Sequence, residues 1–370
     1  MVRFLFSILI FSSVSAYSQA DTTIVEDEED YSMYDNLEFV DEAAKRFCTS
    51  KVLDLSPAKL IWVGYDYQAP HSLNAGTYLD QNIGINFDSQ EVEIPSGAGG
   101  LRLGANIPVI SRNNIIIQLG ANLQQTEYYV NQVEDMSAPL SKFHPMRDLI
   151  RYGRLNTMGL NSTIFKPFNE NYFLVAQVSQ DWNGDYELGD FNAMHNPTTS
   201  AALIFGKKPN DRKQIGFGFS RTYRGGQLMY IPVMLLNWTA PSRKWGVEVL
   251  APARGHYRRT FNSRTLMLIG YEMEGNSYVL SNPTMFSNSN STFALRRSEL
   301  RFRAVLETSI KGFIWLSWQV GYRYNYRYNV DEWSDGKDFY RGFLGDQPYA
   351  IENDLKGTLY SMVTINLVSP

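Results

Sequence analysis

Charged residues recur at every second position from residue 297 to residue 303, and again at residue 307. Because successive side chains of a β-strand point to opposite faces, they share one face of a strand whose other face is apolar. The charged face comprises Arg297, Glu299, Arg301, Arg303 and Glu307. Inside a barrel, such a ladder forms either a salt-bridged network that stiffens or plugs the interior, or an arginine-lined constriction that favours anions. We favour the network and keep both interpretations open.

Acid–base catalysis would depend on four histidines, His71, His144, His195 and His256. A barrel hydrolase needs a histidine held beside a nucleophile. No histidine has His-x-Ser or His-x-x-x-His spacing, and the neighbours His71 and Ser72 would point to opposite faces of a strand. We therefore expect no enzyme, no catalytic residue and no cofactor.

Metal binding has two candidate sources, and neither is favoured. The acidic residues near position 335 lack the spacing of a calcium-binding EF-hand loop, so we expect a solvated loop. They are Asp331, Glu332, Asp335 and Asp338. The single cysteine, Cys48, excludes metal sites built on cysteine and any intramolecular disulfide framework.

The element that must position these charges is the long alternating segment 313–330, FIWLSWQVGYRYNYRYNV. Soluble strands usually have about 5–6 residues, whereas a tilted strand that crosses a bilayer needs roughly 9–11. The apolar face ends in an expected aromatic girdle at the lipid headgroups, formed by Tyr322, Tyr324, Tyr326 and Tyr328. The polar face places Arg323 and Arg327 in the lumen with the first ladder. If both face water there, we expect both to tolerate replacement by glutamate.

Similar alternating segments follow one another from residue 59 to residue 368, with no helical stretch expected among them. Short Pro-, Asn-, Asp- and Gly-rich connections mostly alternate with long polar ones, such as 131–150, 183–197, 281–292 and 331–354. Outer-membrane barrels have this asymmetry, with short periplasmic turns and longer extracellular loops. A β-sandwich has no reason to sort its connections in this way.

Counting segments predicts an all-β, transmembrane, up-and-down antiparallel barrel of about 14 strands, within a range of 12–16. The upper limit applies if the hairpin at 83–94 joins the wall. Because both termini of such barrels lie in the periplasm, an even number of strands must fit between Arg243 and Ser309. We expect four there, with a tight turn at residues 274–276, and the alternative is two.

The N-terminus predicts export. Residues 1–20 combine Arg3, an apolar run and small residues before cut points after Ala16 and Ala20, which is typical of a signal peptide. Residues 21–50 contain ten acids against two bases and few large apolar residues, so we expect a disordered periplasmic leader. The alternative for this leader is a tether or docking strip for a basic partner. Residues 51–370 form the expected barrel.

Several segments resemble an uncharacterised family of Gram-negative outer-membrane β-barrels, known as a domain of unknown function. They are LIWVGYDY at 60–67, ANIPV at 105–109 followed by 115–123, and VLAP at 249–252 leading into 266–278. The resemblance spans roughly residues 55–368. It implies the barrel fold and supplies no catalytic or binding residues.

These features predict a protein of the Gram-negative outer membrane, in contact with its lipid and with the barrel insertion machinery. Aromatic residues make up 14% of the chain, and charged residues, at 19%, fall below the roughly 25% of soluble domains. The leading hypothesis is a porin-like channel for small polar or anionic solutes. The alternative is a non-conducting barrel whose long loops bind a ligand or partner, and an enzyme ranks last. We expect no nucleic-acid partner, and the sequence leaves the oligomeric state undetermined.

Overall fold

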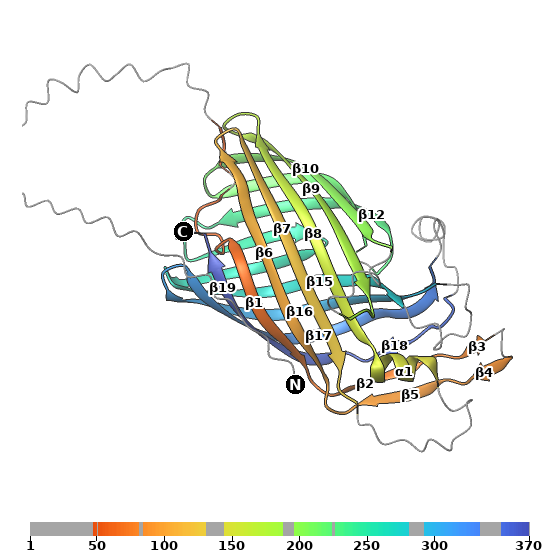
Figure 1. Cartoon of the computed structure of the whole chain (residues 1–370). Helices are drawn as coiled ribbons and strands as arrows, with labels where there is room; N and C mark the ends of the chain where they lie inside the picture. Colours follow the sequence, from red (N-terminus) through yellow and green to blue (C-terminus); the bar gives the residue numbers. More distant parts are fainter. Residues whose placement is uncertain are drawn as a thin grey trace, which may run out of the picture. The chain divides into compact units, whose positions relative to one another are not determined.

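A computed structural model describes residues 47–49, 51–80, 84–130, 144–187, 196–223, 226–280, 292–333 and 349–369. Fourteen strands of this part of the chain close into an antiparallel barrel (Figure 1). In chain order they are β1 (Lys59–Gln68), β6 (Ala98–Arg112), β7 (Ile115–Tyr128), β8 (Arg154–Pro167), β9 (Tyr172–Gly184), β10 (Thr198–Asn210), β11 (Lys213–Thr222), β12 (Met229–Thr239), β13 (Trp245–Ala251), β14 (Arg254–Asn262), β15 (Thr265–Leu280), β16 (Phe293–Lys311), β17 (Ile314–Glu332) and β19 (Thr358–Val368). Each pairs with its chain neighbours in the wall, and β1 closes the ring between β19 and β6. The predicted fold class and the count of 14 are confirmed.

Two local predictions are wrong, and one open question has an answer. The segment 83–94, whose place in the wall the sequence left open, is not in the wall, because β4 (Ile85–Phe87) and β5 (Gln90–Ile94) belong to two small separate sheets. The predicted turn at 274–276 lies inside β15, and the four strands of this region turn instead at residues 252–253 and 263–264. A short helix, α1 (Pro145–Tyr152), interrupts the expected loop at 131–150.

The outward face of the wall is apolar, as lipid contact requires. Aliphatic side chains such as Val178, Leu203, Ile269 and Val363 are exposed there. Aromatic contacts gather toward one end, where Tyr172 stacks on Phe205 and Trp245 lies against Trp238 and Tyr257. Such a band flanked by aromatic residues is the surface of a barrel embedded in a bilayer. In the described residues, no helix is both long and apolar enough to cross a membrane.

The connections differ between the two ends of the barrel, here called the turn end and the loop end. At the turn end, the connections after β6, β8, β10, β12, β14 and β16 have two to five residues. At the loop end, the connections after β1, β7, β15 and β17 are long, but β13 and β14 are joined by only Pro252 and Ala253. The predicted asymmetry therefore has one exception, at the two shortest wall strands.

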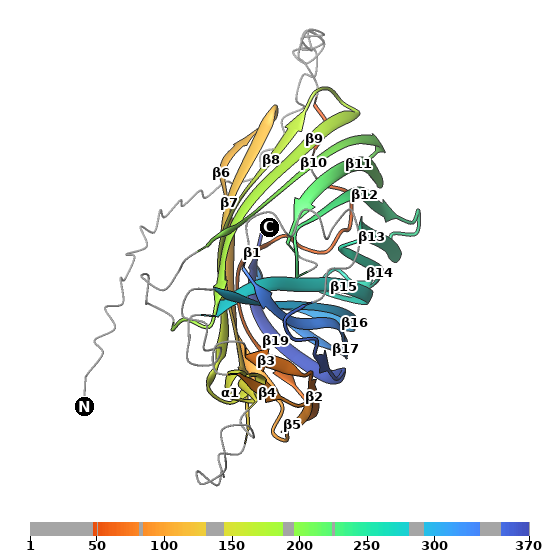
Figure 2. The same ribbon diagram turned by 90° about the vertical axis from the view of Figure 1, so that its right-hand side faces the viewer.

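Strand β15 stays paired with β16 along its whole length, and its loop-end part reaches across to β8 and β9 (Figure 2). It pairs with β14 as far as Glu272, and beyond that point Val279 pairs with Gly184 of β9 on the other side of the barrel. The amide of Asn276 donates to Thr157 Oγ1 of β8 at 3.2 Å. The interior is thereby divided into a first section, bounded by β1, β6–β9, β15–β17 and β19, and a second section, bounded by β9–β15.

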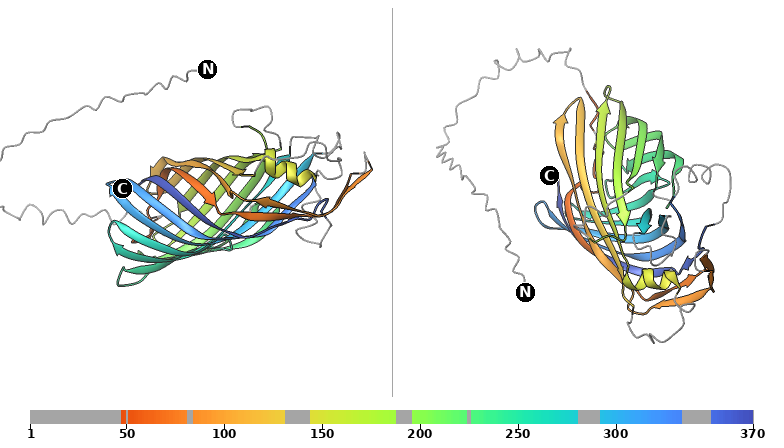
Figure 3. Two further views of the ribbon diagram at one scale, coloured as in Figure 1. Left: turned by 90° about the horizontal axis from the view of Figure 1, so that it is seen from below. Right: turned by 45° about the vertical axis from the view of Figure 1, so that its right-hand side comes forward.

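A cap of small elements covers the loop end of the first section (Figure 3). It consists of β2 (His71–Ala75), β5 and β18 (Asp354–Leu355) in one sheet, β3 (Tyr78–Asp80) and β4 in another, and α1. Its apolar core joins Leu73, Ile94 and Ile150 to Tyr128, Leu295 and Val330 of the wall. His144 holds α1 in place, because its ring accepts from Met146 N and contacts Gly76 O at 2.6 Å. The cap therefore packs like a soluble domain.

An irregular segment before β1 crosses the turn end of the barrel. Residues 51–58, here called the strap, contact in turn Asp211, Thr239, Arg243 and Glu248, which lie on or between β10 and β13. The strap then enters β1, which lies far around the wall from β13. Residues 47–49, assigned to the leader from sequence, anchor the strap at the β8–β9 turn, where Cys48 N donates to Asn169 O at 2.9 Å. The signal peptide and residues 21–46 lie outside the described residues.

The apolar outward face leads to a prediction about a charge placed in the bilayer interior. Val320→Arg places a cation on the lipid face in the middle of β17. We expect it to destabilise the folded barrel, reducing its free energy of unfolding by roughly 2–4 kcal/mol. Ile310→Arg places the same charge on the outward surface at the turn end, where the expected loss is about 0–1 kcal/mol. Urea titration of folding into lipid vesicles, followed by heat-modifiable gel mobility, measures both. Equal losses would show that Val320 does not face the bilayer interior.

Candidate functional site

The first section is filled by a charge network centred on Glu299 of β16. Its carboxylate accepts from Arg297 Nη2 at 2.8 Å and from Arg301 Nε at 2.6 Å, and Arg323 Nη1 lies 3.6 Å away. Their side chains are all at most 3% exposed. Three guanidinium groups thus converge on one carboxylate that water does not reach.

A second part of the network joins β16 to strands from the start of the barrel. Asp66 of β1 lies 2.8 Å from Arg102 of β6 and 3.1 Å from Arg301. Glu274 of β15 lies 2.5 Å from Arg102 and 2.7 Å from Arg301. The charge network thus comprises four arginines, Arg102, Arg297, Arg301 and Arg323, against three carboxylates, Asp66, Glu274 and Glu299. Sequence analysis missed Asp66, Arg102 and Glu274, although Asp66 is the one charged residue in its apolar stretch.

Arg323 links the charge network to the cap. Its guanidinium hydrogen-bonds to the amide oxygen of Gln68, and its Nη2 lies 3.3 Å from Nε2 of His71, the first residue of β2. Burial, followed by the repulsion of Arg323, lowers the pKa of His71 to about 4. The ring is therefore neutral at neutral pH, so it accepts from Arg323 through Nε2 and donates from Nδ1 to Ala69 O, 2.8 Å away.

The other arginine ladder residues also face inward and are paired. Arg303 forms an ion pair with Glu272, donates to Gln319 Oε1 at 3.2 Å, and contacts His256 at 3.0 Å. Glu307 lies 2.7 Å from Lys59 Nζ and accepts from Ser317. These contacts match a salt-bridged network. The described arginines of the ladder are all paired, so they do not form the arginine-lined constriction that was the alternative.

The placement of Arg327 and Tyr328 differs from the prediction because of a β-bulge. Ser298 pairs with Arg327 whereas Glu299 pairs with Asn325, so Tyr326 is an extra residue on β17. Such a residue reverses the side-chain alternation beyond it. Tyr328 therefore shares the inward face with Arg297, is 1% exposed and donates to Tyr128. Arg327 shares the opposite face with Ser298 and does not line the lumen.

The remaining girdle candidates lie on the outward face. Tyr322, Tyr324 and Tyr326 are all exposed, on the loop-end half of β17. Among the described residues, no group of three or more His, Cys, Asp or Glu is placed to hold a metal. His195, Asp335 and Asp338 lie outside the described residues.

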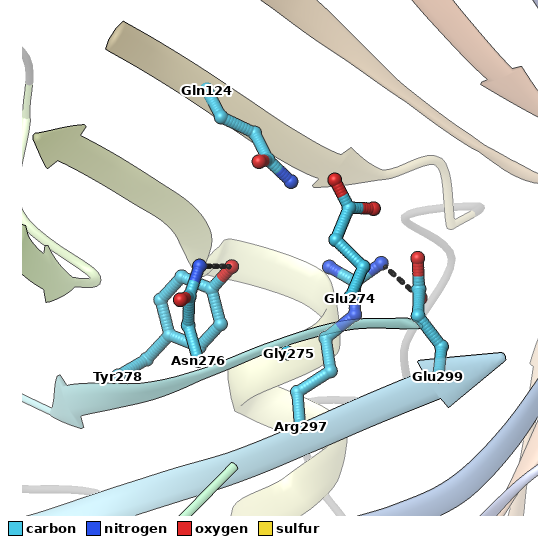
Figure 4. Close-up of a pocket in the computed structure, with 7 residues that line it drawn as sticks. All are labelled: Gln124, Glu274, Gly275, Asn276, Tyr278, Arg297 and Glu299. Carbon is cyan, nitrogen blue, oxygen red and sulfur yellow. Dashed lines mark hydrogen bonds and ion pairs between the residues drawn. The ribbon is translucent and has the colours of Figure 1, made fainter. Parts of the chain in front are cut away.

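A small cavity lies beside the charge network, between β7 and the crossing part of β15 and β16 (Figure 4). It is lined by Gln124, Glu274, Gly275, Asn276, Tyr278, Arg297 and Glu299. Its volume of about 10 Å³ is close to the space that one water molecule needs. A cavity of this size and polarity suits a structural water and admits no larger solute.

The second section has a different, more accessible lining. Gln177 of β9 points inward, since it pairs with Ala202 and alternates with the outward Val178, yet it is exposed. Its inward neighbours toward the loop end carry hydroxyl groups, on Ser179, Ser200 and Ser220. Toward the turn end, Asn237 donates to Gln214 at 3.0 Å. The lining is therefore polar and rich in small side chains.

At the turn end, the strap and its anchor lie against the strands of the second section. Cys48 packs with Phe165 and Phe173 on the inward face of β8 and β9. Lys208 of β10, 5% exposed, donates to Thr49 Oγ1 at 2.6 Å and to Lys51 O at 2.8 Å. Burial raises the pKa of the Cys48 thiol, which keeps it protonated. No sequence signal of period two marks these residues.

The charge network predicts a large effect of removing its central carboxylate. Glu299→Gln leaves three buried arginines without their shared counter-ion, and we expect a loss of folding free energy of about 3–5 kcal/mol. The matched change Glu127→Gln breaks an exposed pair with Arg154, for which about 0–1 kcal/mol is expected. Urea titration in lipid vesicles measures both, and similar losses would contradict the buried network. Arg323 belongs to the same buried network. We therefore expect its replacement by glutamate to destabilise the barrel, contrary to the expectation from the sequence.

His71 predicts that docking of the cap depends on pH. An undocked histidine with a pKa near 6.5 binds a proton that the docked ring, with a pKa of about 4, does not. Docking should therefore weaken as pH falls from about 6.5 to 4, by roughly 2–3 kcal/mol at the lower limit. Hydrogen exchange of the amides of β2 and β5 measures this. The variant His71→Gln should lose that pH dependence, and an unchanged profile would exclude His71 as its source.

Comparison with solved structures finds other barrels. An outer membrane channel from Pseudomonas putida F1 is 11% identical, with 85% of this chain and 97% of that chain covered and a TM-score of 0.37. The outer membrane protease OmpT from Escherichia coli is 11% identical, with 85% and 99% covered and a TM-score of 0.30. The Pseudomonas putida toluene transporter TodX is 9% identical, with 87% and 95% covered and a TM-score of 0.34.

Comparison of the sequence with known families gives one match. No curated protein matches the chain. The model of the family described as "Domain of unknown function (DUF6268)" matches residues 145–355, which is more than half of the chain and includes β8–β17. The chain therefore belongs to the DUF6268 family.

Proposed function

We propose that this protein is an outer-membrane transporter for small polar solutes, which pass through the second section of its barrel. The observation that carries the proposal is the exposed, inward-facing Gln177 within a hydroxyl-rich lining of β9–β11. The first section offers no comparable route, because the charge network and the cap fill it.

The interior favours polar solutes without a strong preference for anions. An arginine selects anions when its charge faces the solute path. Here Arg297, Arg301 and Arg303 each contact a carboxylate. The second section presents serine hydroxyls and the amides of Gln177, Gln214 and Asn237. Such groups exchange hydrogen bonds with sugars, amides and small alcohols.

The outward surface supports a membrane location, and its topology supports the outer membrane. An apolar wall flanked by aromatic side chains is stable only in lipid. Short turns at the end where β1 begins and β19 ends are the arrangement of barrels whose turn end faces the periplasm. Export would follow from the predicted signal peptide at residues 1–20.

The alternatives have less support. Ligand binding by long loops would depend largely on residues 131–143, 188–195, 281–291 and 334–348, which lie outside the described residues. For an enzyme, the three histidines that the structure describes have the wrong neighbours. His71 and His256 contact arginines, and His144 contacts a backbone carbonyl and caps α1.

The route predicts a difference between two neighbouring substitutions on β11. Ser220→Trp places a large ring inside the second section, whereas Phe219→Trp replaces one exposed aromatic residue with another on the lipid face. We expect the first variant to lose most of its conductance in planar bilayers and its uptake of small sugars in vesicle swelling. The second should conduct like the parent. Equal conductance of two folded variants would exclude this route.

A further inference from the structure

We propose that the strap is a gate at the turn end of the second section, latched by the ion pair between Asp54 and Arg243. The inference rests on the proposed transport function and adds the element that controls it. In the structure the strap lies across the turn-end edge of β10–β13, and as a gate it would let a solute leave the second section only when it moves.

The strap is placed to close this exit. Leu53 N donates to Asp211 O at 2.8 Å, and Leu53 O accepts from Thr239 Oγ1 at 2.7 Å. Ser56 reaches inside the wall, where its backbone and hydroxyl groups donate to Glu248 at 2.9 and 2.6 Å. The strap thus runs along the inner rim of β10–β13 before it crosses to β1.

The strap is held much more weakly than the cap. Its contacts are mainly single hydrogen bonds to turns and strand ends, and Leu53 remains 44% exposed. Val52 is its one fully buried apolar residue among those described. The cap, by contrast, shares a continuous apolar core with six wall strands. Of the two closures, the strap is the one that thermal motion opens more readily, because it buries less apolar surface.

The latch is the most specific contact of the strap. Arg243 donates from Nε and Nη2 to the two oxygens of Asp54, at 2.6 and 2.8 Å. This bond lowers the pKa of Asp54, so the pair is charged at neutral pH. The arginine side chain is 62% exposed, so salt and competing charges reach it. The latch is therefore sensitive to conditions at the turn end.

Cys48 supplies a native reporter of strap opening. It is buried in the anchor immediately before the strap, and its sulfur lies 3.6 Å from Tyr172 O. Because it is the only cysteine of the chain, a maleimide reports this position alone. The thiol should react only when the anchor and strap lift away from Phe165 and Phe173.

The first experiment measures alkylation of Cys48 in the full mature chain, folded into vesicles. Arg243→Asp places two acids together and should raise the rate roughly three- to tenfold. The exchanged pair, Asp54→Arg with Arg243→Asp, should bring the rate back toward that of the parent. Arg264→Asp, at the separate β14–β15 turn, is the matched control and should leave the rate unchanged. Equal rates in all four proteins would overturn the latch.

The second experiment locks the strap and measures conductance. In a Cys48→Ser background, Leu53→Cys and Asp211→Cys join two residues that a backbone hydrogen bond already brings together. The oxidised protein should conduct little, and reduction should restore the parent conductance. If the locked and reduced proteins conduct equally, the strap is not a gate although transport stands. If the reduced protein, the parent and the faster-reacting Arg243→Asp all fail to conduct or take up solute, both the transport function and the gate are wrong.

Discussion

The arrangement of the barrel interior depends on one carboxylate. Glu299 neutralises guanidinium groups from β16 and β17 at a position that water does not reach. A buried arginine that loses its counter-ion is strongly destabilising, so this carboxylate stabilises the packing of both strands. The crossing of β15 depends on the same network, because Glu274 binds Arg301 and Arg102 immediately before β15 reaches β8 and β9. The division of the interior into two sections thus follows from satisfying buried charge.

The strands of the barrel wall could be predicted because their pattern is local in the sequence. Each strand alternates apolar and polar residues, and residues 313–330 alone indicate a lipid-facing and an inward-facing side. The prediction fails where one residue changes the pattern. The extra residue Tyr326 reverses the faces of Arg327 and Tyr328, and no alternation in the sequence marks it. Gly275, which suggested a turn, lies within β15, opposite Ser298 of β16, where the strand no longer pairs with β14.

The candidate site could be predicted only in part, because its partners lie far apart in the chain. The ladder on β16 is visible as a pattern of period two, but its counter-ion Asp66 is 235 positions before Arg301. Whether two such distant residues meet depends on which strands become neighbours in the closed barrel. The secondary-structure propensity of the residues does not encode that. The strap has no repeat of any kind, since it is held by backbone groups and by single side chains such as Asp54 and Ser56. Contacts of that type have no signature in composition or spacing.

The charge network also bears on how the barrel assembles. Its acids and bases come from β1 and β6 near the beginning of the chain and from β15–β17 near the end. Arg102 meets Asp66 as soon as β1 and β6 pair, but its contact with Glu274 and the contact of Arg301 with Asp66 require the last strands to join the first. A partly inserted sheet therefore lacks part of its ion pairing and is less well suited to lipid. These ion pairs form together with ring closure, so a truncated chain has buried arginines with fewer carboxylate partners.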